Sequence, residues 1–272
     1  MADESFEGKV AVITGATQGL GEATARRMAG AGAIGVAVVG RDHARGEAVA
    51  ASLPCAARFI AADLADASAA ADVMGEVDAL FGRVDVLVNA AALTVRGSVW
   101  DTDAELWDRM LAVNTRAPGL LITEAVKIMA REGIAGSIVN IGSVAAHGGQ
   151  DFLYPYATSK AALQALTRNA AHALMRRRIR VNLIQPGWMA TPGEDAIQRT
   201  FHDAVDGWQD RAAADLPFGR LIDPHELART ICFLASDASG LMTGAIIDFD
   251  QSVAGAGNAP VPPAGPTWGE PT

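Results

Sequence analysis

The sequence predicts a single α/β domain, built on a doubly wound parallel sheet of about seven strands with helices on both faces. Three observations predict this fold. Short apolar runs of strand length recur along the chain, and Ala-rich stretches of helical period separate them. A glycine-rich turn, Thr14 to Gly21, directly follows the first apolar run. Because such sheets bind ligands at the carboxyl ends of their strands, functional residues are expected just after the strands.

The elements alternate in chain order. The strands are predicted over Val10–Thr14, Val36–Val39, Arg58–Ala61, Val84–Asn89, Gly136–Ile141, Val181–Gln185 and Ala245–Phe249. The helices are predicted over Gly21–Ala31, Ala44–Leu53, Ser68–Phe81, Asp103–Arg131, Tyr156–Arg176 and Pro224–Ala235. No interdomain linker and no internal repeat interrupts them, so residues 1–253 are predicted to form one domain.

Two segments depart from the alternation. Pro192–Leu216, just after a strand end, mixes aromatic, acidic and small residues. A substrate-covering lid is expected at such a place, and an ordinary pair of surface helices is the alternative. Ala254–Thr272 is rich in Pro and Gly, which predicts an extended or disordered tail.

Composition excludes some partners. Of 272 residues, 50% are hydrophobic and 19% charged, and the net charge is -9. This balance argues against a nucleic-acid partner, which would need clustered Lys and Arg. The dense basic run, Arg176–Arg178 with Arg180, lies at the end of a predicted helix. We expect it to complement that helix's dipole.

The chain is predicted to act in the cytoplasm. Its two cysteines, Cys55 and Cys232, are far apart and have no Cys or His at metal-ligand spacing. A disulfide framework and a metal site are therefore not expected. The first eight residues are polar and do not resemble a signal peptide, and no apolar run is long enough to span a bilayer.

The glycine turn indicates a phosphate-binding site. Gly15, Gly19 and Gly21 allow backbone to turn tightly and to approach a phosphate without an intruding Cβ. The helix that follows offers free N–H groups and the positive end of its dipole. The Lys-Ser/Thr of a P-loop is missing, which disfavours a nucleoside triphosphate.

A second group of residues suits proton transfer at an alcohol. Tyr156 and Lys160 are four apart on one helix face, Ser143 follows a strand, and Asn114 lies within or at a break in the preceding long helix. A phenol with a pKa of about 10 needs about 4 kcal/mol to become a base near pH 7. One ammonium about 4 Å away supplies energy of that order at an effective dielectric near 20. Ser143 would hold the substrate oxygen by a hydrogen bond.

At these residues the chain resembles the short-chain dehydrogenase/reductase family, over about Glu7 to Ser252. The family's glycine turn matches Thr14, Gly15, Gly19 and Gly21, and its catalytic tetrad matches Asn114, Ser143, Tyr156 and Lys160. The resemblance implies a Rossmann-type domain, catalytic as well as dinucleotide-binding. It also implies a hydride transfer between a nicotinamide cofactor and an alcohol or ketone on a small molecule.

The resemblance also implies a role for each residue. Tyr156 is expected to be the general acid/base, and Lys160 to lower its pKa and bind the nicotinamide ribose. Ser143 would orient the substrate carbonyl, and Asn114 would hold a water in a proton relay. The resemblance and the glycine turn together give these expected cofactor-binding residues: Gly15, Thr17, Gln18, Gly19, Leu20, Gly21, Arg41, Asp63, Leu64, Asn89, Ala91, Tyr156, Lys160, Pro186, Gly187, Met189 and Thr191.

One motif departs from the family pattern. The family's Asn-Asn-Ala-Gly after the fourth strand reads Asn89-Ala90-Ala91-Ala92. Alanine keeps a small surface against the cofactor, so binding is expected to persist. The departure leaves the hydrogen bonding of this loop open.

The residues after the second strand favour NADP(H) over NAD(H). Gly40 stands where an acidic residue would bind the ribose 2′-hydroxyl, and Arg41 would attract a 2′-phosphate. Two observations favour the alternative, NAD(H): Gln18 is neutral where many NADP-dependent relatives carry a cation, and Asp42 could pair with Arg41.

The substrate is expected to be a neutral polyol, sugar or small ketone. Acidic residues of the predicted lid, Glu194, Asp195, Asp203 and Asp206, with few cations nearby, disfavour an anionic carrier protein or coenzyme A. A 3-oxoacyl thioester reductase is the alternative. Six residues flank the tetrad or lie in the lid, and could either line the pocket or pack: His147, Gln150, Phe152, Trp188, His202 and Trp208.

A homotetramer is expected, because the two long helices before and after Ser143 are apolar beyond one face. The residues concerned are Leu106, Met110, Leu120, Leu121, Leu163, Leu166 and Leu174. Two rival functions are less compatible with the sequence. A non-catalytic dinucleotide-binding sensor would not need the tetrad, and a nucleotide-sugar epimerase or dehydratase would need a larger carboxy-terminal domain.

Overall fold

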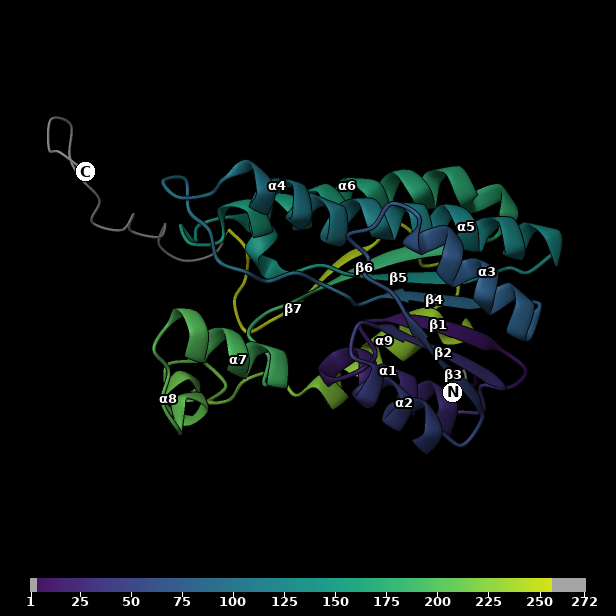
Figure 1. The fold of residues 1–272 in the computed structure, drawn as a ribbon, viewed down its shortest axis with the longest axis horizontal. Helices are drawn as coiled ribbons and strands as arrows, with labels where there is room; N and C mark the ends of the chain where they lie inside the picture. Colours follow the sequence, from purple (N-terminus) through teal and green to yellow (C-terminus); the bar gives the residue numbers. More distant parts are fainter. Residues whose placement is uncertain (1–3, 256–272) are drawn as a thin grey trace, which may run out of the picture.

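The structure, a computed structural model, describes residues 4–255 of the chain. Most of the predicted tail, Ala254–Thr272, lies outside the described residues. Seven parallel strands form one sheet in the order β3-β2-β1-β4-β5-β6-β7 (Figure 1). The strands are β1 (Val10–Thr14), β2 (Gly35–Gly40), β3 (Ala56–Ala61), β4 (Val86–Asn89), β5 (Ser137–Ile141), β6 (Arg180–Pro186) and β7 (Ile246–Phe249).

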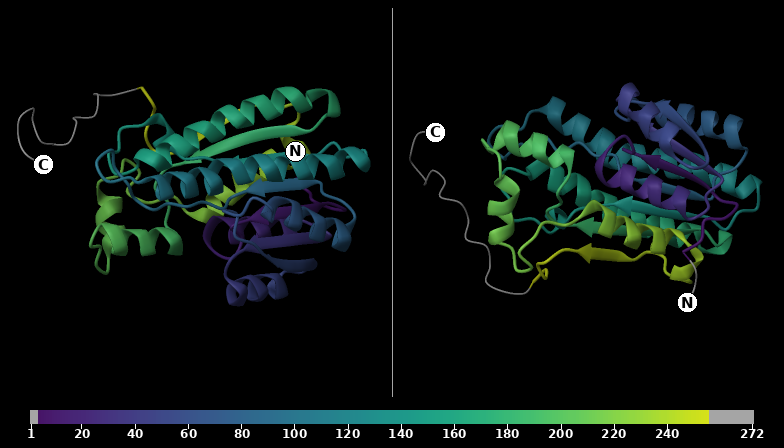
Figure 2. Two further views of the ribbon diagram at one scale, coloured as in Figure 1. Left: turned by 45° about the horizontal axis from the view of Figure 1, so that its top comes forward. Right: turned by 90° about the horizontal axis from the view of Figure 1, so that it is seen from below.

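Helices cover both faces of this sheet. They are α1 (Gly19–Gly30), α2 (His43–Ser52), α3 (Ala69–Phe81), α4 (Ala104–Leu111), α5 (Ala117–Arg131), α6 (Tyr154–Leu174), α7 (Pro192–Phe201), α8 (Trp208–Ala214) and α9 (Pro224–Ala235). One apolar cluster packs α1, α2 and α9 against the sheet, and a second packs α3, α5 and α6 against its other face (Figure 2). The predicted doubly wound α/β fold is therefore confirmed.

The order of the strands fixes where a ligand can bind. From β1 the chain runs outward to β2 and β3, then returns to pair β4 with the opposite side of β1. The loops after β1 and β4 diverge at this reversal, which leaves an opening at the carboxyl ends of the strands. The helices α7 and α8 project at this end of the sheet (Figure 1).

The long helix predicted over Asp103–Arg131 is not continuous. It consists of α4, a π-helical turn over Ala112–Arg116, and α5. A physical reason is Pro118 in the first turn of α5. In a regular α-helix its ring would clash with the carbonyl of residue 114, and it has no N–H to donate. The wider turn before it relieves this clash, and it carries Asn114.

The basic run lies at the end of a helix, as expected. Arg176 and Arg177 lie in a 3₁₀ turn after α6. Arg180 lies in β6, and its guanidinium donates to the carbonyls of Leu234 (2.7 Å) and Ser236 (2.8 Å) at the end of α9. Arg180 therefore complements the carboxyl end of a second helix, α9, and the role of Arg176 and Arg177 at the end of α6 stays a prediction.

In the described part of the chain, no helix combines the length and the apolar character needed to cross a bilayer.

Candidate active site

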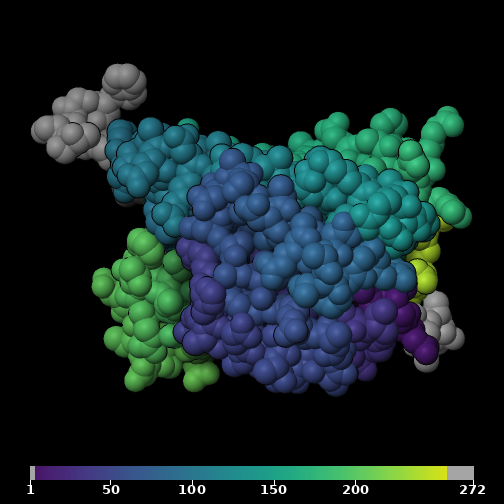
Figure 3. Space-filling view, turned by 45° about the vertical axis from the view of Figure 1, so that its right-hand side comes forward, coloured from purple at the N-terminus to yellow at the C-terminus, as the bar shows by residue number. Residues whose placement is uncertain are grey.

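A cavity of about 640 Å³ opens at the carboxyl ends of β1, β4, β5 and β6. Its volume lies in the range typical of small-molecule sites. Figure 3 shows α7 and α8 (green) standing beside the amino-terminal half of the domain (purple and blue). All the expected cofactor-binding residues except Asn89 line this one cavity, and so does Ser143. The structure thus brings the glycine turn and three of the four tetrad residues together.

The glycine turn is shaped by close backbone contacts. Gly15 has φ +67°, and a Cβ there would lie 2.8 Å from the Cα of Ala91 in the loop after β4. A Cβ on Gly21 would overlap the carbonyl group of Gly15. Gln18, the residue before α1, makes no capping bond with its side chain. The first N–H groups of α1 therefore remain available to an anionic group such as a pyrophosphate.

The loop after β4, where the family motif is altered, is held by Thr14. Its hydroxyl oxygen accepts from the backbone N–H groups of Ala90 and Ala91, both at 3.1 Å. The side chain of Asn89 does not line the cavity: it is buried, and its Nδ2 donates to Oδ1 of Asn140 at 2.8 Å. Among the described residues, Oδ1 of Asn89 is a buried oxygen without a hydrogen-bond partner. The structure thus gives Asn89 a place behind the cavity wall.

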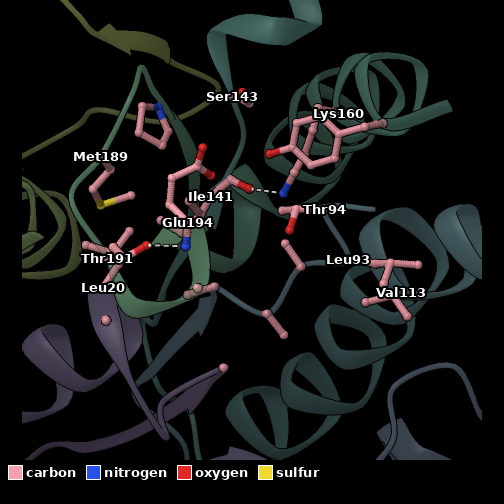
Figure 4. Close-up of a pocket in the computed structure, with 18 of the residues that line it drawn as sticks. Leu20, Leu93, Thr94, Val113, Ile141, Ser143, Lys160, Met189, Thr191 and Glu194 are labelled. Carbon is pink, nitrogen blue, oxygen red and sulfur yellow. Dashed lines mark hydrogen bonds between the residues drawn. The ribbon is translucent and has the colours of Figure 1, made fainter. Parts of the chain in front are cut away.

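Tyr156 and Lys160 project from the first turns of α6, and Ser143 follows β5. Lys160 is 2% exposed, and its Nζ donates to the carbonyl of Ile141 at 2.8 Å (Figure 4). This ammonium lies 5.7 Å from the centre of the Tyr156 ring. The Ser143 hydroxyl caps a short 3₁₀ turn by accepting from the N–H of Ala145 at 3.1 Å. The three side chains therefore share one wall of the cavity.

Burial sets the protonation of this wall. Burial lowers the pKa of Lys160 from an ordinary value of 10.5 to about 8. Burial raises the pKa of Tyr156, and the negative charge of Glu194 adds to this, while the Ser143 hydroxyl and the positive charge of Arg96 act in the opposite direction. Without a ligand, the phenol is therefore held in its neutral form and is able to donate a proton.

The shift at Lys160 predicts how stability depends on pH. From pH 8 to 10.5 the folded chain releases the proton of Lys160 before the unfolded chain does, so the free energy of unfolding rises. Because Lys160 is already half titrated at pH 8 in the folded chain, the gain between pH 8 and pH 10 is about 2 kcal/mol. Urea unfolding at pH 8 and pH 10 should show this gain in the wild type relative to Lys160→Met. The matched control is Lys127→Met, which removes a 64% exposed lysine. An equal change in the free energy of unfolding between pH 8 and pH 10 for wild type and Lys160→Met would contradict the lowered pKa of Lys160.

Asn114 holds the reactive helix in place. Its Oδ1 accepts from the N–H of Leu93 at 2.8 Å, and its Nδ2 donates to the Leu93 carbonyl (2.9 Å) and to Oγ of Ser159 (3.0 Å). Ser159 in turn donates to the carbonyl of Tyr156 at 2.7 Å. Thr115, in the same π turn, donates to the Ser159 carbonyl at 3.0 Å. Asn114 is fully buried and does not line the cavity, so its expected part in a proton relay stays a prediction.

Beyond the end of β2 the structure adds a cation that sequence reasoning missed. Asp42 does not pair with Arg41; it caps α2 and lies 3.3 Å from Nε of Arg45. Arg45 hydrogen-bonds Oε1 of Gln18. Arg41 lines the cavity, and no ion pair with another described residue engages it. Gln18 is neutral, as the sequence shows, but Arg45 brings a positive charge to it from α2.

Asp63 and Leu64, which follow β3 and are expected to bind the cofactor, line the cavity. Oδ1 of Asp63 accepts from the N–H of Ala65 at 3.0 Å, and its Oδ2 lies 3.7 Å from Arg109. Leu64 lines the cavity beside it. Both residues thus line the cavity, and their part in binding the cofactor stays a prediction.

The substrate side of the cavity mixes aromatic and charged groups. Gln150, Phe152, Trp188 and His202 line it, whereas Trp208 is buried against Trp188, with ring centres 5.7 Å apart. His147 instead binds Asp248 at 3.0 Å. Arg96 also lines the cavity, although the sequence did not predict it. The sequence shows only that an arginine stands in the loop after a predicted strand.

The residues present fit a dinucleotide. Glycines leave room for a close approach, a helix N-terminus faces the turn, and a buried amide oxygen without a partner lies behind the loop. A nicotinamide bound there would supply or accept a hydride. The chain's own groups can donate a proton from Tyr156 and hold an oxygen at Ser143.

Comparisons with known proteins agree with this geometry. The family model described as Enoyl-(Acyl carrier protein) reductase matches residues 15–253. The chain is 36% identical over 252 residues to cis-4-hydroxycyclohexanecarboxylate dehydrogenase of Sinomonas cyclohexanicum, covering 91% of this chain and 97% of that one. A solved structure titled short chain dehydrogenase/reductase family protein is 36% identical, with TM-score 0.77, and covers 90% of this chain and 97% of its own. L-sorbose reductase from Gluconobacter frateurii, complexed with NADPH and L-sorbose, is 27% identical with TM-score 0.86, covering 93% and 99%.

Proposed function

Because the chain belongs to the short-chain dehydrogenase/reductase family, we propose that it interconverts a secondary alcohol and a ketone on a small polyol-like or sugar-like molecule with NADP(H). The chain is an oxidoreductase that transfers a hydride between a nicotinamide cofactor and an alcohol or ketone. The observation that carries our assignment of roles is the convergence of Ser143, Tyr156 and Lys160 on one wall of the cavity that the glycine turn also lines.

The roles follow from the geometry of that wall. In reduction, the Tyr156 hydroxyl gives its proton to the substrate oxygen; in oxidation, the phenolate takes it back. The Lys160 ammonium stabilises the phenolate that exists between these two proton transfers. No carboxylate is among the groups that shift the pKa of Lys160, so none competes with the phenolate for this ammonium. Ser143 donates a hydrogen bond to the substrate oxygen and so fixes the reacting carbon beside Tyr156. Asn114 hydrogen-bonds Ser159, which in turn donates to the carbonyl of Tyr156. Through Ser159 it therefore positions Tyr156 and the adjacent Lys160 on α6.

A panel experiment tests the proposal. Purified protein is titrated with NADPH and NADH by fluorescence, then assayed with polyols, sugars, small ketones and β-ketoacyl thioesters. We expect tight NADPH binding and turnover of a small alcohol or ketone. Turnover confined to thioesters would reassign the protein as a 3-oxoacyl thioester reductase. No binding of either cofactor would contradict the proposal.

Preference for NADP(H) is supported by two arginines. Arg41 lines the cavity and Arg45 reaches Gln18 in the glycine turn, so both flank the place expected for the 2′-phosphate. Gly40 carries no side chain that could repel a phosphate, and a Cβ there would lie 2.6 Å from the methyl group of Thr17. The relative solved with L-sorbose was complexed with NADPH.

Removal of these charges should change the cofactor preference. Charged hydrogen bonds contribute about 1.5–3 kcal/mol each, so Arg41→Ala should raise the Kd for NADPH by about tenfold or more. Arg45→Ala should act in the same direction, and the Kd for NADH should stay nearly constant in both. Arg131→Ala, which removes an arginine paired with Asp78 far from the cavity, is the control. Equal weakening of NADPH and NADH would show that the arginines do not recognise the phosphate.

A homotetramer that uses the face of α4, α5 and α6 remains our proposal. Met110, Leu121 and Leu163 are buried within one chain and cannot support it. Leu106, Leu120, Leu166 and Leu174 are only partly buried, and they leave apolar surface on these helices. Light scattering at micromolar concentration tests the assembly, and a monomeric mass would refute it. The cytoplasm remains our proposal for the compartment, in keeping with unpaired Cys55 and Cys232.

A further inference from the structure

Arg96 is an almost buried cation at the substrate end of the cavity. It lies in the loop after β4, its side chain is 14% exposed, and it lines the same cavity as Tyr156. Its guanidinium stands 5.4 Å from the centre of the Phe152 ring. The proposed mechanism gives it no task, since Tyr156, Lys160 and Ser143 already account for the proton and the substrate oxygen.

The protein satisfies only part of this guanidinium. Nε donates to Nε2 of His202 at 3.0 Å, and one terminal nitrogen donates to the Thr94 carbonyl at 3.3 Å. The other terminal nitrogen lies 3.7 Å from Oε1 of Glu194, beyond a normal hydrogen bond. That oxygen accepts instead from Trp188 (3.0 Å) and Gln198 (2.8 Å). Three of the five guanidinium N–H groups are therefore left without a good acceptor among the described residues.

The lid offsets this cation only in part: Glu194 lies 3.7 Å from it, and two other lid carboxylates are engaged elsewhere. Asp195 accepts from Trp208 (2.7 Å) and pairs with Arg199 at 2.9 Å, and Asp206 pairs with the same arginine at 2.9 Å. The negative charges counted in the sequence are thus partly neutralised by partners within the lid itself. Burial lowers the pKa of Arg96 more than the nearby carboxylate of Glu194 raises it, and the Arg96 charge also acts on Tyr156. A positive charge that is poorly solvated and incompletely paired therefore faces the reaction centre.

A carboxylate on the substrate would satisfy these groups. Terminal guanidinium nitrogens in a fork match the two oxygens of a carboxylate, and such bonds are the stronger kind of hydrogen bond. Phe152 and Trp188 line the cavity beside Arg96 and offer apolar surface to the rest of a small molecule. We propose that Arg96 binds the carboxylate of the substrate, so that the enzyme acts on small hydroxy acids and the corresponding oxo acids. This inference rests on the proposed function and narrows its substrate.

Matched pairs of probes test the inference. 4-Oxocyclohexanecarboxylate is compared with its neutral amide, and gluconate with sorbitol, by kcat/KM with NADPH or NADP⁺. The wild type should prefer the carboxylate by about 100-fold, the range expected for a charged pair shielded from water. Arg96→Gln should remove most of this preference because kcat/KM falls far more for the carboxylate than for the neutral probe, and Arg96→Lys should retain part of the preference.

Two further variants separate recognition from a purely structural role. Glu194→Gln removes the competing charge but keeps an acceptor, so the KM for the carboxylate should fall several-fold. Arg199 lies on the same helix as Glu194, α7, but does not line the cavity. Arg199→Gln should therefore leave the preference for the carboxylate unchanged. If Arg96 only fastened α7, both Arg96→Gln and Glu194→Gln would weaken charged and neutral probes alike. That result, or a wild type without preference for the carboxylate, would overturn the inference.

The outcome stays separable from the proposed function. If the neutral probes turn over and the carboxylates gain nothing, the oxidoreductase mechanism stands and the role of Arg96 fails. If no probe turns over, the role of Arg96 is tested by binding alone. Calorimetry then measures the binding of cyclohexanecarboxylate and of cyclohexanecarboxamide to the NADP⁺-loaded protein. Binding of the acid alone, lost in Arg96→Gln, supports the inference, and equal or absent binding of the two overturns it.

Discussion

Tyr156→Phe is expected to lower kcat by about a thousandfold and to leave the Kd for NADPH within about twofold. The variant lacks only the hydroxyl that gives and takes the substrate proton. The ring remains, so the packing of the first turn of α6 and the position of Lys160 should persist. The Lys160 ammonium still faces the cavity, but no phenolate is left for it to stabilise.

The chain offers a matched control for this change. Tyr154, the other tyrosine of the sequence, is 44% exposed and stacks edge-on against Trp107. Tyr154→Phe removes the same hydroxyl two residues away and should leave kcat and the Kd unchanged. A Tyr156→Phe protein that binds NADPH and retains more than about a tenth of the wild-type kcat would contradict the general acid/base role.

Gly21→Ala is expected to weaken NADPH binding by about a hundredfold or more, at a cost of about 3 kcal/mol. The added Cβ overlaps the Gly15 carbonyl, which is backbone and cannot rotate away. Gly15 itself has little room to shift, because the backbone of Ala91 lies close to it. The turn must therefore open, and the N–H groups expected to bind the pyrophosphate move with it.

Gly30→Ala, in the last turn of the same helix, is the control. A Cβ there has no neighbour within 4 Å, so the substitution should be neutral or slightly stabilising. Fluorescence titration with NADPH and thermal unfolding of both variants separate binding from folding. Unchanged NADPH affinity in a folded Gly21→Ala protein would show that the turn does not carry the phosphate.

Much of the fold could be predicted from the sequence because its signals are local. Each buried strand is a short apolar run such as Val10–Thr14, and the glycine turn follows one of them directly. Parallel strands then bring their carboxyl ends to one edge. This topology alone predicts that Gly15, Ser143 and Gly187 meet, although they are distant in the chain.

The missed features depend on contacts between distant residues. The π turn results from Pro118 acting on the carbonyl of residue 114, and periodicity alone does not reveal such a local widening. Arg45 is significant because α2 brings it to Gln18, and Arg96 because α7 brings His202 and Glu194 to it. The sequence shows the net charge of a segment, but it does not show which charges are already paired.

The strand order has a consequence for how this enzyme can evolve. The residues proposed to choose the cofactor, Arg41 and Arg45, follow β2 on one side of the reversal, and Arg96 follows β4 on the other. No hydrogen bond or ion pair between the described residues joins the two groups directly. Substitutions at sites that share no partner usually add in free energy. Cofactor choice and substrate choice are therefore separable traits, and selection or laboratory evolution can exchange one and retain the other.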